Sequence, residues 1–220
     1  MRASGIRDFP SYSLAERRAD QIVHVIGFAA ASIAVAWLWT RLGQGATGKQ
    51  IGAVLAYSCG LLGMVSASGL YNCARPGSVK AVLRHVDHSM IFVMIAGSYT
   101  PFALNALSPG VGLPLCATVW GFAGLGITLK LTYPCRYQLV SLALYLSMGW
   151  LVLCVLPWLL VSLRWQIVAL LLTGGIIYSL GSLVHTRARV PFHNAIWHAM
   201  VLLAAGLHLA AVVQLFPSSG

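Results

Sequence analysis

Long apolar runs separated by short polar stretches dominate the pattern of this chain. An α-helix needs about 20 mostly apolar residues to cross the hydrocarbon core of a bilayer. Seven runs of about this length can be placed, at residues 19–40, 51–71, 86–107, 111–129, 137–156, 165–185 and 192–214. They are continuously apolar and too long for the alternating strands of a membrane barrel. The pattern predicts an all-α integral membrane protein, a bundle of seven transmembrane helices.

The connections between the runs predict a single membrane domain. Turn and breaker residues mark them, as in "ARPGS" after the second run and "RARVP" before the seventh. We expect a cytoplasmic N-terminal arm at 1–18, a membrane domain at 19–214 and a short tail at 215–220. The arm has no short apolar core followed by a small-residue cleavage site, so it does not resemble a cleaved signal peptide.

Composition and charge agree with a membrane location and indicate its orientation. The chain is 59% hydrophobic and 8% charged, whereas about a quarter of the residues in a soluble domain are charged. The net charge of +10 is spread over short loops without a basic and aromatic stripe, so we expect no nucleic-acid partner. With a cytoplasmic N-terminus and an outside C-terminus, only Arg41, Lys49 and Arg164 of the 14 basic residues fall outside. The positive-inside rule favours this orientation in the plasma membrane.

This orientation brings polar residues that are distant in sequence to one depth. The second run ends at the cytoplasmic side, where the third and seventh runs begin. A charge at the bilayer centre costs roughly 2.5 to 3.5 kcal/mol, so ionisable groups in the runs are candidates for function. The residues expected in this layer are Ser68, Asn72, Asp87, His88, His193, Asn194 and His198.

Helical spacing places several of these side chains on shared faces. Asn194 and His198 are four residues apart, and Ser68 and Asn72 have the same spacing. His208 continues the stripe of His198 about 15 Å deeper in the membrane. Histidines with a carboxylate can bind zinc and activate a water molecule, but a polar network that fixes helix packing would use the same residues. The spacing leaves both interpretations open.

Other polar groups and motifs add little. Asp20 and His24 are four apart in the first run and can pair with the same cluster or with the basic loops. Glu16 is the sole glutamate, which excludes an H-E-x-x-H zinc helix, and no G-x-S-x-G nucleophile motif is present.

Four stretches give the chain a family resemblance. They are "ERRADQIVHVIG" at 16–27, "SASGLYN" at 66–72, "LRHVDHSMIFVMIAGSYTPFAL" at 83–104, and the pair "GGIIYSLG" and "HNAIWHAMVLLAAGLH" at 174–181 and 193–208. Together they resemble the hemolysin III family, the bacterial branch of the progestin and adipoQ receptor proteins.

The resemblance implies a seven-helix bundle with a cytoplasmic N-terminus and a zinc ion held by three histidines. One ligand ends an S-x-x-x-H segment and two form the H-x-x-x-H of the last span. Ser68 and Asp87 match the serine and aspartate beside the zinc and its water, and His198 matches one ligand. The other two ligand positions carry Asn72 and Asn194. Asparagine is a poor zinc ligand because its oxygen is neutral and suits harder cations.

Three alternatives follow for the site. Zinc can be held by a displaced set of Cys73, His193 and His198. The cluster can instead form a hydrogen-bonded network without metal, or bind metal weakly through His198, Asp87 and an asparagine oxygen.

The expected function is that of a lipid-interacting or membrane-regulating protein with a degenerate zinc-type site and membrane lipids as partners. His208 and Tyr99 would then shape a lipid cavity. The alternative is a zinc-dependent, ceramidase-like hydrolase of a lipid amide or ester, with Asp87 orienting the water and Ser68 beside it. The asparagines count against this enzyme. A pore-forming cytolysin has less support, because no regular polar stripe crosses the full bilayer.

Overall fold

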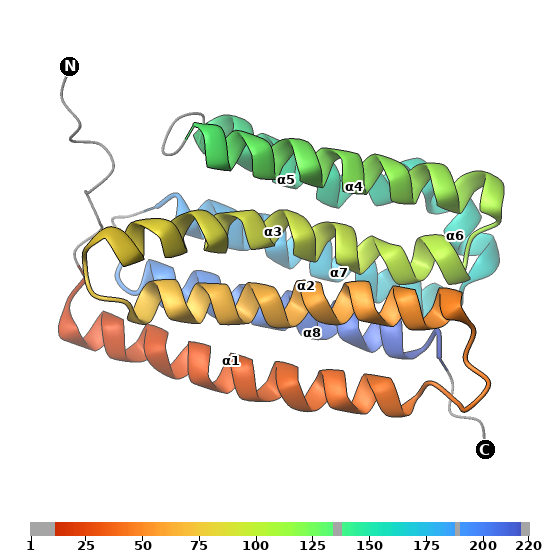
Figure 1. Ribbon diagram of the computed structural model, residues 1–220, viewed down its shortest axis with the longest axis horizontal. Coiled ribbons are helices and arrows are strands. Elements are labelled where there is room, and N and C mark those ends of the chain that lie inside the picture. The colour runs from red at the N-terminus through yellow and green to blue at the C-terminus, as the bar shows by residue number, and fades with distance from the viewer. Residues whose placement is uncertain (1–11, 134–137, 188–189, 217–220) are drawn as a thin grey trace.

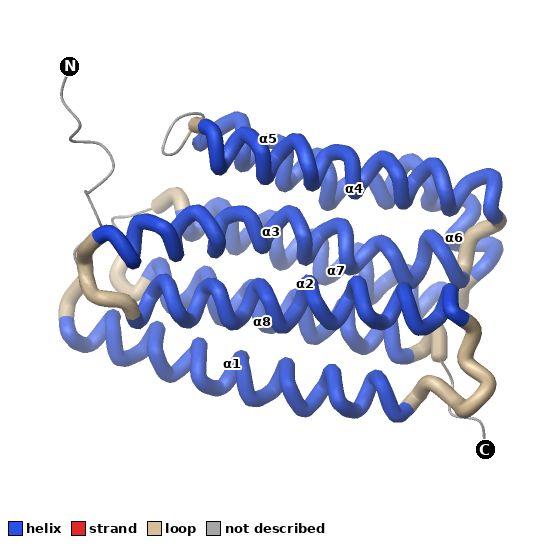
Figure 2. The backbone as a smooth tube through the Cα atoms, viewed as in Figure 1, coloured by secondary structure: helices blue, strands red, loops and turns tan. Residues whose placement is uncertain are grey.

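Helices make up nearly all of the computed structural model, which describes residues 12–133, 138–187 and 190–216. These residues contain no strand, in agreement with the all-α prediction. The helices are α1 (Leu14–Thr40), α2 (Gly48–Cys73), α3 (Ser78–Asn105), α4 (Pro109–Thr132), α5 (Gln138–Trp150), the 3-10 helix η1 (Leu151–Val155), α6 (Leu156–Ser162), α7 (Trp165–His185) and α8 (His193–Val213). They run side by side along the long axis of the molecule, with loops gathered at its two ends (Figures 1 and 2).

Local capping explains where the first two helices begin. The Ser13 hydroxyl accepts a hydrogen bond from the Glu16 backbone N–H at 3.2 Å, and the Glu16 carboxylate accepts one from the Ser13 N–H at 2.9 Å. Thr47 and Gln50 form the same reciprocal pair at the start of α2. Such a capping box satisfies N–H groups that lack partners within the helix. α1 therefore starts at Leu14, ahead of the apolar run predicted from 19.

The fifth apolar run, predicted as one helix at 137–156, is interrupted and extends further. α5 ends at Trp150, a 3-10 segment follows to Val155, and α6 continues to Ser162. Pro157 lies in the first turn of α6. Proline has no N–H to donate and would break the hydrogen-bond ladder in the interior of one continuous α-helix, whereas the first turn of a new helix does not need that N–H. Leu139–Ser162 as a whole is still long and apolar enough to cross a membrane.

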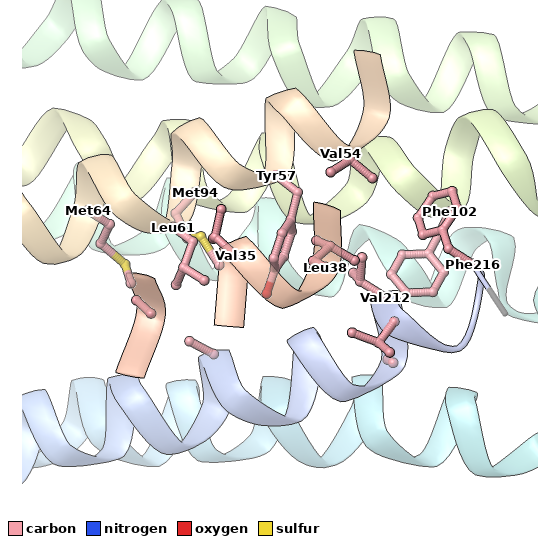
Figure 3. Packing of buried hydrophobic residues seen from close by; sticks show 14 of the residues in the cluster. Val35, Leu38, Val54, Tyr57, Leu61, Met64, Met94, Phe102, Val212 and Phe216 are labelled. Carbon is pink, nitrogen blue, oxygen red and sulfur yellow. The ribbon is translucent and has the colours of Figure 1, made fainter. Parts of the chain in front are cut away.

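Two apolar clusters hold the helices together. One is centred on α1, α2 and α8 and includes the fully buried Leu38, Tyr57 and Val212 (Figure 3). The other joins α3 and α4 to the α5–α6 segment and includes Phe92 and Met148.

Small residues allow some helices to approach closely. A Cβ atom at Gly97 of α3 would lie 2.7 Å from the Ala56 carbonyl oxygen of α2. The α2 and α3 backbones therefore pack at a distance that only glycine permits at this position, as is common between membrane helices.

Six helical segments in the described residues are long and apolar enough to span a bilayer, namely all the long ones except α3. Their outward faces carry large apolar side chains in contact with the surroundings, among them Ile33, Leu125, Val161 and Leu183. In a lipid environment these side chains need no protein cover. The protein is an integral membrane protein. α3 contains Lys80, Arg84 and Asp87 near its beginning, which lower its apolar character.

Candidate functional site

A buried polar cluster joins α1 to α8 near the end of the bundle where both helices begin (Figure 1). Asp20 and His24, one helical turn apart on α1, face His198 of α8. The Asp20 Oδ1 atom lies 2.6 Å from His198 Nδ1, and Asp20 Oδ2 lies 3.4 Å from His24 Nε2. The two imidazole centroids are 4.3 Å apart. All three residues are at least nine-tenths buried, so this is a concentrated polar site within an apolar bundle.

Ser68 of α2 extends this cluster on the other side of His198. Its Oγ atom lies 3.4 Å from His198 Nε2. A neutral imidazole has one N–H donor and one acceptor nitrogen. Because a carboxylate only accepts, Asp20 selects the tautomer with the proton on Nδ1, which leaves Nε2 free to accept from the Ser68 hydroxyl. Asp20, His198 and Ser68 thus form one continuous polar chain.

The two asparagines at the expected ligand positions are bonded to each other. Asn194 donates from Nδ2 to Asn72 Oδ1 at 3.3 Å, and Asn72 donates from Nδ2 to the Ser68 carbonyl oxygen at 3.0 Å. Asp87 of α3 is half-buried, and its carboxyl group interacts with the Ser68 side chain. Ser68, Asn72, Asp87, Asn194 and His198 thus lie around one polar region of the structure.

The two residues of the displaced ligand set lie elsewhere. The His193 ring nitrogen Nδ1 is 3.1 Å from the Val190 carbonyl oxygen, and its ring packs 5.6 Å from that of Tyr12. Cys73 is exposed. Burial raises the pKa of Tyr12 to about 12, so this phenol stays protonated at neutral pH. The set of Cys73, His193 and His198 is not assembled in this conformation.

A cavity of about 560 Å³ extends from the polar cluster into the bundle. This volume is within the usual range of small-molecule sites. Ser68, Asn72, Asp87, Asn194 and His198 line its polar end, and most of its remaining lining is apolar, from α3, α5 and α7.

His208 and Tyr99 are among the residues that line this cavity. His208 Nε2 lies 3.2 Å from the Leu171 carbonyl oxygen. The Tyr99 hydroxyl donates to the Gly149 carbonyl and accepts from the Val152 N–H, both at 2.8 Å. Tyr99 thereby ties α3 to the point where α5 gives way to η1.

The donor atoms present do not make the three-histidine zinc site that the resemblance implies, because Asn72 and Asn194 occupy two of its positions. A different group, Asp20, His24 and His198, offers one ligand atom each within 4.8 Å of one another. His24 Nε2 is buried and makes no hydrogen bond within the described residues, which suits a metal ligand. Ligands about 2.0–2.1 Å from tetrahedral zinc lie roughly 3.3 Å apart, however, and the 2.6 Å between Asp20 and His198 is a hydrogen-bond distance. This pair would have to separate to bind zinc.

Sequence reasoning placed His198 in the site but left the partner of Asp20 and His24 open. The available signal was their i, i+4 spacing on a shared helical face. Whether that face turned to α8 or to the basic loops depended on how the helices pack.

Comparison with known proteins identifies the family. Residues 13–209 match the sequence model of the family described as "Haemolysin-III related". The chain belongs to the haemolysin-III related family. It is 34% identical over 191 residues to the "Hemolysin-3 homolog" of Bacillus subtilis, which covers 87% of this chain and 90% of the relative. It is also 33% identical over 187 residues to "Hemolysin-3" of Bacillus cereus, which covers 85% of each chain.

The haemolysin-III resemblance extends to a human protein. The "Monocyte to macrophage differentiation factor" of Homo sapiens is 33% identical over 144 residues, which cover 60% of this chain and 58% of the human protein. This match to a human protein agrees with the progestin and adipoQ receptor family, which the sequence motifs resemble. The protein is thus a haemolysin-III type integral membrane protein of the bacterial plasma membrane.

Proposed function

We propose that this haemolysin-III protein binds a single-chain lipid in its central cavity and acts as a lipid-interacting membrane protein. The observation that carries the proposal is the form of the cavity: one end presents Ser68, Asn72 and Asn194, while the walls beyond are mainly apolar. Burial of an apolar chain stabilises binding by roughly 25 cal/mol per Å² removed from contact with water, and a few polar groups then fix the orientation of the head.

Two tryptophans make this binding measurable. Trp150 and Trp197 line the cavity, whereas Trp158 and Trp165 are exposed on the outside of the bundle. A brominated long-chain fatty acid added to the protein in detergent micelles should quench fluorescence with a saturable component at about one lipid per chain. Bromine in the micelle around the bundle adds a component that does not saturate.

The saturable component should disappear in the double variant Trp150→Phe and Trp197→Phe. It should persist in the matched control, Trp158→Phe and Trp165→Phe. Quenching of the unmodified protein without a saturable component would contradict lipid binding in the cavity.

A second candidate function is metal-dependent hydrolysis of a lipid amide or ester. It is favoured by the buried group of Asp20, His24 and His198. The Nε2 atom of His24 is buried and makes no hydrogen bond within the described residues. Bound zinc would supply a water of lowered pKa as the nucleophile. Elemental analysis should then find about one zinc per chain, lost in His24→Ala and His198→Ala and retained in His85→Ala, a histidine outside this group. If the purified protein is incubated with zinc and retains none after the excess is removed, this function is excluded.

The orientation proposed for the bundle is seven crossings with the N-terminus in the cytoplasm. α1 begins and α8 ends at opposite ends of the molecule, which requires an odd number of crossings (Figure 1). α3, 28 residues long and antiparallel to α2 and α4, supplies the seventh crossing (Figure 1). The predominance of basic residues on the predicted inner loops supports the direction.

A further inference from the structure

Asp20, His198 and Ser68 are arranged in the order carboxylate, imidazole and hydroxyl. The carboxylate lies 2.6 Å from Nδ1, and the hydroxyl lies 3.4 Å from Nε2 of the same ring. In serine hydrolases this order allows the imidazole to take the hydroxyl proton while the carboxylate holds the ring in the required tautomer. A nucleophile-to-base distance slightly beyond a normal hydrogen bond is common before substrate binds. Ser68 also lines the cavity, where a bound acyl chain would lie.

The asparagines provide amide donors close to the backbone of Ser68. Each side-chain amide has two N–H groups. Asn72 uses one on the Ser68 carbonyl, and Asn194 uses one on Asn72, which leaves the second N–H of each for another acceptor. Both residues line the cavity. Neutral amide donors near a nucleophile can stabilise the oxyanion that forms when a carbonyl is attacked.

The distance between Asp20 and His198 favours this arrangement over a metal site. The 2.6 Å between the two atoms is a hydrogen-bond distance, shorter than the roughly 3.3 Å between two ligands of a tetrahedral zinc ion.

We infer that Ser68 is a metal-independent nucleophile that is acylated by an ester of a single long-chain fatty acid. The inference rests on the proposed lipid cavity. Ser68 Oγ forms a bond to the carbonyl carbon, its proton passes to His198 Nε2, and the carbonyl oxygen becomes the oxyanion. The bond to the alcohol oxygen then breaks, and the alcohol leaves with the proton from His198. Water then gives a proton to His198 Nε2 and attacks the acyl carbon. The bond to Ser68 Oγ breaks, that oxygen takes the proton back from His198, and the fatty acid is released.

The test uses the full-length protein in detergent micelles with EDTA present and a fluorophosphonate that carries a long alkyl chain. Fluorophosphonates phosphonylate activated serines. Peptide mass spectrometry should locate the adduct on Ser68. Labelling should vanish in Ser68→Ala and fall on the order of 10³-fold or more in His198→Ala. Ser66→Ala, on the same helix but not in the cavity lining, should label normally.

Asp87 is another acceptor beside Ser68, so its variant decides which group takes the proton. Loss of labelling in Asp87→Asn, with labelling retained in His198→Ala, would overturn the assignment of His198. Labelling that requires added zinc would overturn the metal-independent step.

Asp20 is a positioning residue in this scheme. Asp20→Asn should lower the maximal rate of labelling by on the order of 10³ to 10⁴-fold, while the probe concentration that gives half the maximal rate stays unchanged. A purely structural role would change that concentration as well.

The labelling test and the lipid-binding test can fail independently. If the brominated lipid binds saturably but Ser68 of the unmodified protein acquires no adduct, the nucleophile is excluded and the lipid-binding proposal stands. If no saturable lipid binding occurs, the proposed function fails first.

Discussion

Asn194 of α8 donates a hydrogen bond to Asn72 of α2 at 3.3 Å. These residues are 122 positions apart and occupy the two places where the family resemblance implies zinc-binding histidines. Their contact shows that the two ligand positions still converge in this protein. Where the resemblance implies imidazole ligands, this protein has two neutral amides that bond to each other.

Restoring both histidines should therefore create a zinc site. The double variant Asn72→His and Asn194→His places three imidazoles, with His198, at one end of the cavity, and imidazole nitrogens suit zinc. We expect about one tightly bound zinc per chain by elemental analysis, and weaker binding in each single variant. A double variant that stays folded and binds no more zinc than the unmodified protein would show that these side chains do not converge as described.

The close contact between α2 and α3 predicts a glycine requirement. Gly97→Ala would put a Cβ atom 2.7 Å from the Ala56 carbonyl oxygen, so the helices must separate. Overpacking of this kind costs roughly 1–3 kcal/mol, and thermal unfolding in detergent should occur at a lower temperature. Gly124→Ala on α4, where nothing lies within 4 Å of the added atom, is the control and should unfold at the same temperature or higher. Equal effects of the two changes would argue against the close packing of α2 on α3.

Two tyrosines should respond differently to loss of their hydroxyl groups. Tyr99→Phe leaves the Gly149 carbonyl and the Val152 N–H without their shared partner, which should cost roughly 1–3 kcal/mol in unfolding free energy. The Tyr57 hydroxyl is buried and has no hydrogen-bond partner in the described part of the chain, so Tyr57→Phe should be neutral or stabilising. Chemical unfolding in mixed micelles measures both. A Tyr57→Phe variant less stable than Tyr99→Phe would reverse this assignment.

The proposed orientation predicts which loops an impermeant reagent can reach. In a variant with all five native cysteines replaced by alanine, Ala46→Cys in the α1–α2 loop should react with an impermeant maleimide in intact cells. Arg75→Cys in the α2–α3 loop should react only after the membrane is permeabilised. The opposite pattern would place the N-terminus outside.

The apolar runs alone were sufficient to predict the helices, because a bilayer requires long segments whose backbone groups bond internally. They could not predict the break in the fifth run at 151–155, since periodicity carries no information on whether a helix continues before a proline or tightens into a 3-10 turn. The beginning of α1 at Leu14 depended on the capping box of Ser13 and Glu16, which lies outside the apolar pattern.

The site, like the fold, was predictable from the sequence only in part. Helix direction and residue count were enough to predict from the sequence that Ser68, Asn72, Asp87, Asn194 and His198 lie at one depth in the membrane. The contacts of His198, with Asp20 on one side and Ser68 on the other, follow from the packing of the helices. These contacts depend on how α1, α2 and α8 rotate about their axes when their apolar faces pack, and a linear pattern does not specify those rotations.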